Sequence, residues 1–124
     1  MMNKPALFDT NILIDLFRGQ RQAMQALEDY SAQRAISLIT WMEVMVGAKK
    51  YQQEHQTRVA LSAFEIIEVS RDIAERSVAL RMEYGMKLPD AIILATAQVH
   101  RRDLLTRNTK DFADIPGVIT PYVL

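Results

Sequence analysis

Four acidic residues, Asp9, Glu43, Asp90 and Asp111, lie beside apolar runs of the kind that form buried strands or helices. Asp9 stands between two such runs, and Asp90 begins one directly after Pro89. A carboxylate in such surroundings is costly to desolvate unless a cation or hydrogen-bond donors meet it. The repeated pattern indicates that these acids could act together on a metal ion, provided that the fold brings them to one place.

The chain alternates between predicted strands and predicted helices. Short apolar runs with the composition of buried strands occupy 6–8, 35–39, 66–69, 104–106 and 118–120. Apolar residues recur at helical spacing over 12–17, 20–33, 40–48, 59–64, 73–84 and 89–95. This order predicts a three-layer α/β/α fold, in which helices cover both faces of a mostly parallel central sheet of about five strands.

In a parallel sheet the carboxyl ends of all strands lie at one edge, where open α/β sheets bind their ligands. Asp9, Glu43 and Asp111 follow strands and are expected at this edge. Asp90 joins them if its helix starts there, as a right-handed crossover to the next parallel strand requires. Each acid also has an ordinary structural role available. Asp9 could cap a helix, Glu43 could complete a capping box with Thr40, and Asp90 could interact with a helix dipole.

Carboxylates gathered at one edge repel one another unless a cation lies among them. An all-oxygen set suits Mg²⁺, or Mn²⁺ as an alternative, and such ions assist phosphodiester hydrolysis by activating water and neutralising charge. The chain has no cysteine. Its two histidines, His55 and His100, lie far apart in the sequence, so a zinc site is not indicated.

Composition indicates one folded domain over residues 1–124, with 49% hydrophobic residues and a formal net charge of zero. No apolar run approaches the ~20 residues of a membrane span, and the first residues do not look like a signal peptide. The absence of cysteine suits a reducing, cytoplasmic location. A nucleic acid would have to be held by a local basic patch, because the chain has no net positive charge.

Four stretches carry a resemblance to a known family: Phe8–Asn11, Glu43, Leu88–Ala91 and Thr106–Phe112. In order and spacing they resemble the motifs of the PIN-domain ribonucleases, most of all the VapC-type toxins of bacterial toxin–antitoxin pairs. The resemblance covers the whole chain. It implies a Mg²⁺-dependent endoribonuclease that cuts an RNA such as tRNA, rRNA or mRNA. It also implies a homodimer that a small VapB-like antitoxin holds inactive, with no membrane association.

Carried over by position, Asp9, Glu43 and Asp90 match the three core acids of the family, as catalytic and metal-binding residues. Many relatives have an aspartate where this chain has Asn108. We therefore expect Asp111 to be the fourth acid and Asn108 to be a polar supporting residue.

The remaining expectations concern the surroundings of these acids. Thr10 is expected to orient Asp9 through its hydroxyl, and Asp15 is expected to be solvated on the far side of its helix. Arg107 and Lys110, beside the predicted site, are candidates for contact with RNA phosphates.

Three further basic residues, Arg18, Arg101 and Arg102, are weaker candidates for phosphate contact. An antitoxin is expected to lay an apolar helix into a groove beside the site and to present a basic side chain to the acids. Trp41 and Met42 could line such a groove, although Trp41 would fit equally well in the core.

Three other functions remain open at this point. A phosphatase of the haloacid-dehalogenase type would use Asp9 as a nucleophile, but it would require a second acid where this chain has Asn11. The same PIN fold could serve an RNA-processing nuclease without a toxin role. A non-catalytic binding module is disfavoured by the complete set of acids.

Overall fold

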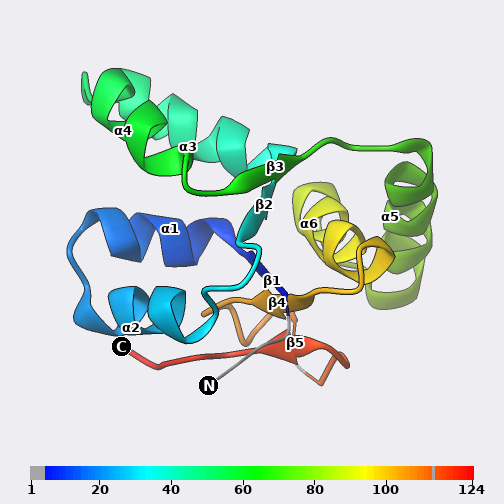
Figure 1. Ribbon diagram of the computed structural model, residues 1–124. Helices are drawn as coiled ribbons and strands as arrows, with labels where there is room; N and C mark the ends of the chain where they lie inside the picture. Colours follow the sequence, from blue (N-terminus) through cyan, green and yellow to red (C-terminus); the bar gives the residue numbers. More distant parts are fainter. Residues whose placement is uncertain (1–4, 113) are drawn as a thin grey trace.

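The computed structural model describes residues 5–112 and 114–124. Its centre is a five-stranded sheet with the strand order β3-β2-β1-β4-β5, and helices lie on both sides of it (Figure 1). The strands are β1 (Ala6–Phe8), β2 (Ala35–Ser37), β3 (Glu65–Ile67), β4 (Asp103–Leu105) and β5 (Val118–Ile119). Every neighbouring pair is parallel, which confirms the predicted fold class.

The helices are α1 (Thr10–Phe17), α2 (Arg21–Asp29), α3 (Leu38–Lys50), α4 (Glu54–Leu61), α5 (Arg71–Tyr84) and α6 (Leu88–Val99). Figure 1 shows α1 and α2 on one side of the sheet and α5 and α6 on the other. None of the helices in the described ranges is long and apolar enough to cross a membrane.

Alternating residues of the central strand divide the core into two clusters. Ala6 and Phe8 face the cluster formed by α1 to α4, whereas Leu7 faces the cluster formed by α5 and α6. This alternation is the two-residue period of a strand that is covered on both faces. The continuous apolar run before Asp9 is thereby explained, and it delivers Asp9 to the carboxyl edge of the sheet.

The start of α3 differs from the prediction. Its N-cap is Ser37, whose Oγ accepts a 3.1 Å hydrogen bond from the backbone N–H of Ile39. Leu38 and Ile39 therefore belong to the helix and not to the preceding strand, and Thr40 lies inside the first turn. The capping box predicted for Thr40 and Glu43 is wrong, because a serine three residues earlier already caps the helix.

The boundaries of α5 follow the sequence signals. Ser70 caps the helix by accepting a 3.2 Å hydrogen bond from the N–H of Ile73. Gly85 ends it in the left-handed conformation, with φ of +69°. By contrast, α2 ends at Asp29, earlier than the predicted end at residue 33.

Arg102 lies at the opposite, amino-terminal edge of the sheet, directly before β4. Its guanidinium donates to the carbonyls of Ala6 and Gln33 and pairs with Glu65 at 3.3 Å. Its side chain is only 8% exposed. The phosphate contact suggested for Arg102 does not fit this geometry, since its side chain is buried and joins strands at the end of the sheet opposite the acids. Arg101 precedes it at that same edge.

Candidate active site

Asp9 is the most buried of the four acids, with 5% of its surface exposed. It caps α1, because its Oδ1 accepts a 2.7 Å hydrogen bond from the backbone N–H of Thr10. Its Oδ2 accepts from the hydroxyl of Thr106 at 2.7 Å and from the side-chain amide of Asn11 at 3.4 Å. The carboxylate is therefore held between the start of α1 and the end of β4.

Burial raises the pKa of Asp9 to about 6, even though the hydrogen bonds from Thr106 and Thr10 lower it. The negative charges of Asp90 and Glu43 add to the rise. A buried carboxyl near two like charges resists ionisation unless a cation is present. Asp9 thus has the electrostatic character of a cation ligand.

Asp90 lies in the first turn of α6 and is partly buried. Burial raises its pKa, the charges of Asp111 and Glu43 raise it further, and the nearby Lys87 lowers it. The structure therefore brings the four acids close enough to influence one another electrostatically. Asp9 interacts with Asp90 and Glu43, and Asp90 interacts with Asp111 and Glu43.

Glu43 projects from α3 with an exposed side chain. Its Oε1 accepts a 2.7 Å hydrogen bond from the hydroxyl of Thr10, which is also hydrogen-bonded to the hydroxyl of Thr40 at 3.0 Å. The Thr10 hydroxyl therefore orients Glu43 and not Asp9, contrary to the prediction. The hydroxyl that orients Asp9 belongs to Thr106, which is fully buried and was assigned no role from the sequence.

Asn108 and Asp111 form a closed turn. The Asn108 amide donates to Oδ2 of Asp111 at 2.9 Å, and the Asp111 backbone N–H donates to Oδ1 of Asn108 at 3.0 Å. The backbone N–H of Asn108 donates in turn to the Thr106 hydroxyl at 3.0 Å. Asn108 therefore has the supporting geometry that was expected, and Lys110 lies exposed in the same turn.

Asp15 is buried, although it was expected to be solvated. Its surface is 2% exposed, and its carboxylate accepts two hydrogen bonds from Arg107, at 2.5 and 3.0 Å, and a third from the Tyr122 hydroxyl at 2.7 Å. Burial opposes ionisation, but the bonds from Arg107 and Tyr122 outweigh it, so the pKa of Asp15 lies below its ordinary value. The Arg107 side chain is thus turned toward Asp15.

In the described ranges, no three acidic or histidine side chains converge as a ready-made metal site. Mg²⁺ does not require such a cage, because it retains several waters and takes one or two carboxylates directly. The donor set here is all oxygen. Asp9 and Asp90, whose pKa values burial raises, are suited to direct coordination, and Glu43 and Asp111 are suited to contacts through water.

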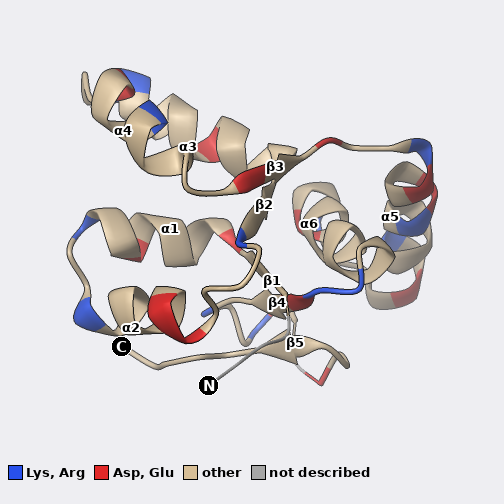
Figure 2. Ribbon diagram, viewed as in Figure 1, with Lys and Arg blue, Asp and Glu red and all other residues tan. Residues whose placement is uncertain are grey.

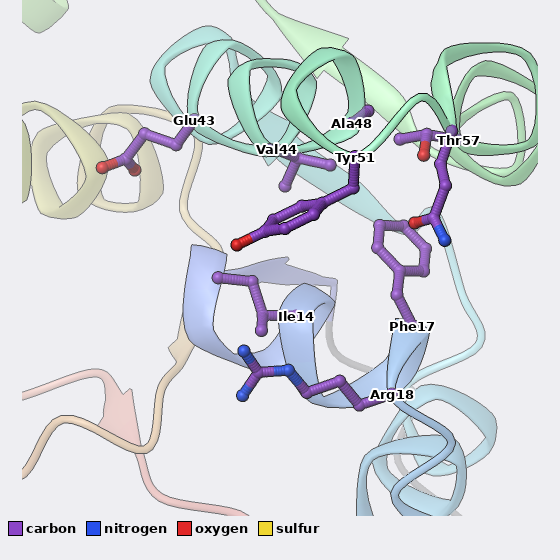
Figure 3. A pocket seen from close by; sticks show the side chains of 10 residues that line it. Ile14, Phe17, Arg18, Glu43, Val44, Ala48, Tyr51 and Thr57 are labelled. Carbon is purple, nitrogen blue, oxygen red and sulfur yellow. The ribbon is translucent and has the colours of Figure 1, made fainter.

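A groove of about 230 Å³ begins at Glu43 and runs between α1 and α3 toward α4. Figure 3 shows Ile14 and Phe17 of α1 facing Tyr51, with Glu43 at one end. The lining residues are Ile14, Phe17, Arg18, Glu43, Val44, Gly47, Ala48, Tyr51, Gln53 and Thr57.

Trp41 and Met42 are absent from the lining of this groove, and for Trp41 the alternative position in the core is the one observed. Trp41 packs against the core cluster of α1 to α4, and the Arg58 guanidinium lies 5.6 Å from the centre of its ring. Met42 is exposed elsewhere on α3.

Comparison with known proteins agrees with this geometry. The PIN domain family model matches residues 6–118. Ribonuclease VapC1 of Methanocaldococcus jannaschii is 32% identical over 111 residues, which cover 86% of this chain and 77% of that protein. A toxin–antitoxin complex from Klebsiella pneumoniae contains a chain that is 76% identical, with a TM-score of 0.93 and coverage of 96% and 99%. VapBC2 from Rickettsia felis, bound to a DNA fragment from its promoter, is 26% identical, with a TM-score of 0.78 and coverage of 92% and 95%. The chain therefore belongs to the PIN-domain family and, within it, to the VapC ribonucleases.

Proposed function

We propose that this chain is the toxin of a type II toxin–antitoxin pair and acts as a Mg²⁺-dependent endoribonuclease, with Mn²⁺ as a possible substitute. The observation that carries the proposal is the pair Asp9 and Asp90, two carboxyls of raised pKa on one sheet edge, with Glu43 and Asp111 beside them. Such a group is unfavourable without a cation and suited to phosphodiester hydrolysis with one. The printed names of the relatives, ribonuclease and toxin–antitoxin complex, support the same conclusion.

Mg²⁺, when bound, supplies positive charge that makes water a better nucleophile at neutral pH and neutralises the scissile phosphate. Asp9 and Asp90 would hold the ion directly. Water attacks the phosphorus, the bond to the leaving oxygen breaks, and that oxygen takes up a proton. Thr106 keeps Asp9 oriented, Thr10 keeps Glu43 oriented, and the closed turn of Asn108 keeps Asp111 in place, so that little reorganisation is needed during the reaction.

The RNA backbone requires a cation that is free to approach it. Lys110 is exposed in the turn that carries Asp111 and is the better of the two predicted phosphate contacts. Arg107 is less suited, because two of its guanidinium nitrogens bind Asp15. Lys87, at the N-cap of α6, lies near enough to Asp90 to lower its pKa and is an additional candidate for phosphate contact.

We propose that the antitoxin binds the groove beside Glu43. Its walls present Ile14, Phe17 and Tyr51, which are apolar or aromatic, and its open end presents a carboxylate. An amphipathic helix could bury its apolar face against these side chains and place a lysine or arginine on Glu43. A bound helix in this position would also block the approach of RNA to the acids.

We further propose a homodimer formed through α5. Its outer face exposes Val78 and Met82, which are 60% and 80% exposed, and Figure 2 shows both charge signs along this helix. If two copies cross antiparallel at Val78, Ala74 meets Met82 of the partner subunit and Glu75 meets Arg81 of the partner subunit. In this arrangement a small side chain faces a large one and an acidic side chain faces a basic one, on both sides of the same centre. A two-fold interface requires such a self-complementary surface.

The direct test combines growth and cleavage. Inducing the wild-type chain alone should arrest growth, whereas Asp9→Asn should not, and co-expression of the cognate antitoxin should restore growth. Purified protein should cleave RNA with Mg²⁺ and lose this activity in EDTA. Cleavage without growth arrest would favour the processing nuclease, and an active Asp9→Asn protein would overturn the proposed site.

A further inference from the structure

The buried carboxylate of Asp15 links three distant parts of the chain. It lies on α1, its bidentate partner Arg107 follows β4, and its third donor, Tyr122, lies in the C-terminal tail. The Asp15 side chain is 3% exposed and the Arg107 side chain 32% exposed. Arg107 was predicted to contact an RNA phosphate, but neither Asp15 nor Tyr122 has a part in the proposed mechanism, which therefore does not account for the buried carboxylate.

The backbone beside Arg107 is tied to the same helix. The Arg107 N–H donates to Oδ1 of Asn11 at 3.1 Å, and the preceding residue, Thr106, donates its hydroxyl to Asp9. Asn11 and Asp15 are four residues apart and therefore share one face of α1. The segment after β4 thus lies along this face and is held at both ends, by Asp9 at the start of the helix and by Asp15 further along.

The segment fixed in this way, Thr106 and Arg107, leads directly into the turn that carries Asp111. The N–H of Asn108 donates to the Thr106 hydroxyl, and the Asn108 side chain holds Asp111. A shift of Arg107 would therefore move Asn108 and, through it, Asp111 relative to Asp9. Together with the backbone of residues 106–108, these hydrogen bonds connect Asp15 to two of the acids, Asp9 and Asp111.

We propose that Asp15 and Tyr122 are positioning residues of the nuclease: they hold Arg107 so that the segment from Thr106 to Asp111 keeps Asp111 in register with Asp9. This inference rests on the proposed function and deepens it. It also gives the C-terminal tail a role in the active site, because the tail supplies one of the donors to Asp15. It assigns Arg107 to the protein framework and not to RNA.

The two assignments of Arg107 make opposite predictions. If Arg107 bound a phosphate, releasing it from Asp15 would strengthen RNA binding, and its replacement would raise KM and weaken the dependence on salt. If Arg107 positions the turn, the loss of Asp15 should lower kcat and leave KM nearly unchanged, because the RNA contacts remain while the acids shift.

The test compares four full-length proteins on one RNA substrate: wild type, Asp15→Asn, Tyr122→Phe and the control Arg102→Gln. The control also removes a largely buried charged member of an ion pair, but at the opposite edge of the sheet and with a partner, Glu65, that is 61% exposed. All proteins are assayed well below their melting temperatures. Asp15→Asn should lower kcat by about 10- to 100-fold, since small displacements of catalytic groups have effects of this size. Tyr122→Phe should have a smaller effect in the same direction, and Arg102→Gln should keep kcat within about twofold of wild type despite a lower melting temperature.

A kcat for Asp15→Asn equal to that of wild type, or a loss of kcat in Arg102→Gln as large as in Asp15→Asn, would overturn the inference. So would a change confined to KM.

The backbone amide resonances of Asn108 and Asp111 separate this inference from the proposed function. They should shift in Asp15→Asn and stay in place in Arg102→Gln. If the wild type cleaves no RNA, the proposed function fails. In that case the amide resonances of Asn108 and Asp111 still test whether Asp15 positions the turn that they form. If these resonances do not shift in Asp15→Asn, the inference about Asp15 is refuted.

Discussion

The hydroxyl of Thr106 donates a 2.7 Å hydrogen bond to Oδ2 of Asp9, although the two residues are 97 positions apart in the chain. The same hydroxyl accepts from the side-chain amide of Asn11 and from the N–H of Asn108. Its single proton is therefore directed at Asp9 by the two donors around it. The orientation of the central acid is set by β4 as much as by its own turn.

Replacing Thr106 should show how much the orientation of Asp9 contributes to activity. Thr106→Val keeps the shape of the side chain but removes the donor to Asp9, and we expect kcat to fall by about tenfold or more. Thr106→Ser keeps the donor and should remain within about threefold of wild type. Single-turnover cleavage of an RNA oligonucleotide measures both, and a fully active Thr106→Val would show that this hydrogen bond is dispensable.

The surroundings of Asp9 predict that activity and stability respond differently to its replacement. In EDTA, the melting temperature of Asp9→Asn should change little, because the loss of a buried charge is offset by an amide group that cannot accept the hydrogen bond of Thr106. Asparagine can still cap α1, so the helix start is preserved. The same variant should cleave no RNA.

Added Mg²⁺ should stabilise the wild type by about 2 to 3 kcal/mol at a hundredfold excess over its dissociation constant, and it should leave Asp9→Asn unchanged. Thermal unfolding with and without the ion measures both effects. An equal gain in the two proteins would place the ion elsewhere.

The sheet edge and its acids were predictable because both depend on local signals. Apolar runs of strand length and helices between them determine a parallel sheet, and the carboxyl ends of its strands then coincide. Asp9 and Asp90 are next to such runs in the sequence. Their proximity therefore follows from the order of the elements alone, without knowledge of any side-chain contact.

The partners of individual polar groups were not predictable in this way. Asp15 has the helical spacing of a solvated residue, and its burial depends on Arg107, 92 positions away, and Tyr122, 107 positions away. The hydroxyl of Thr10 could reach either of two carboxylates, and only the position of α3 decides in favour of Glu43. Pattern and propensity contain no information on such distant pairs.

Asp15 also predicts a dependence of stability on pH. Its pKa is lowered on folding, so its contribution to stability is fully present above the ordinary pKa near 4 and is lost as the pH falls through the lower pKa of the folded state. At pH 7, Asp15→Asn should cost about 3 kcal/mol, because Arg107 loses its charged partner. The difference should shrink progressively below pH 4.

Urea unfolding between pH 3 and pH 7 measures this difference. Asp114→Asn is the control, since Asp114 is exposed and asparagine tolerates its φ of +62°. A difference between wild type and Asp15→Asn that stays constant down to pH 3 would contradict the role of the charged pair.

If the antitoxin binds the groove beside Glu43, a substitution in this groove should weaken antitoxin binding without abolishing RNA cleavage. Phe17→Glu places a charge on an apolar wall, so the antitoxin should bind at least about tenfold more weakly while RNA cleavage persists. Val46→Glu is the control, because Val46 is 68% exposed on α3 but does not line the groove. In cells, co-expressed antitoxin should rescue growth with the control and fail with Phe17→Glu. Equal rescue of both would remove the groove as the binding site.

The proposed dimer interface on α5 can be tested at its central residue, Val78. Val78→Lys would place two ammonium groups against each other at the centre of the proposed interface, and we expect it to convert a dimer into a monomer. Val59→Lys is a matched control, since Val59 on α4 has the same 60% exposure as Val78. Sedimentation equilibrium on the isolated chain distinguishes the two states. A monomeric wild type, or a dimer that only Val59→Lys disrupts, would rule out α5 as the interface.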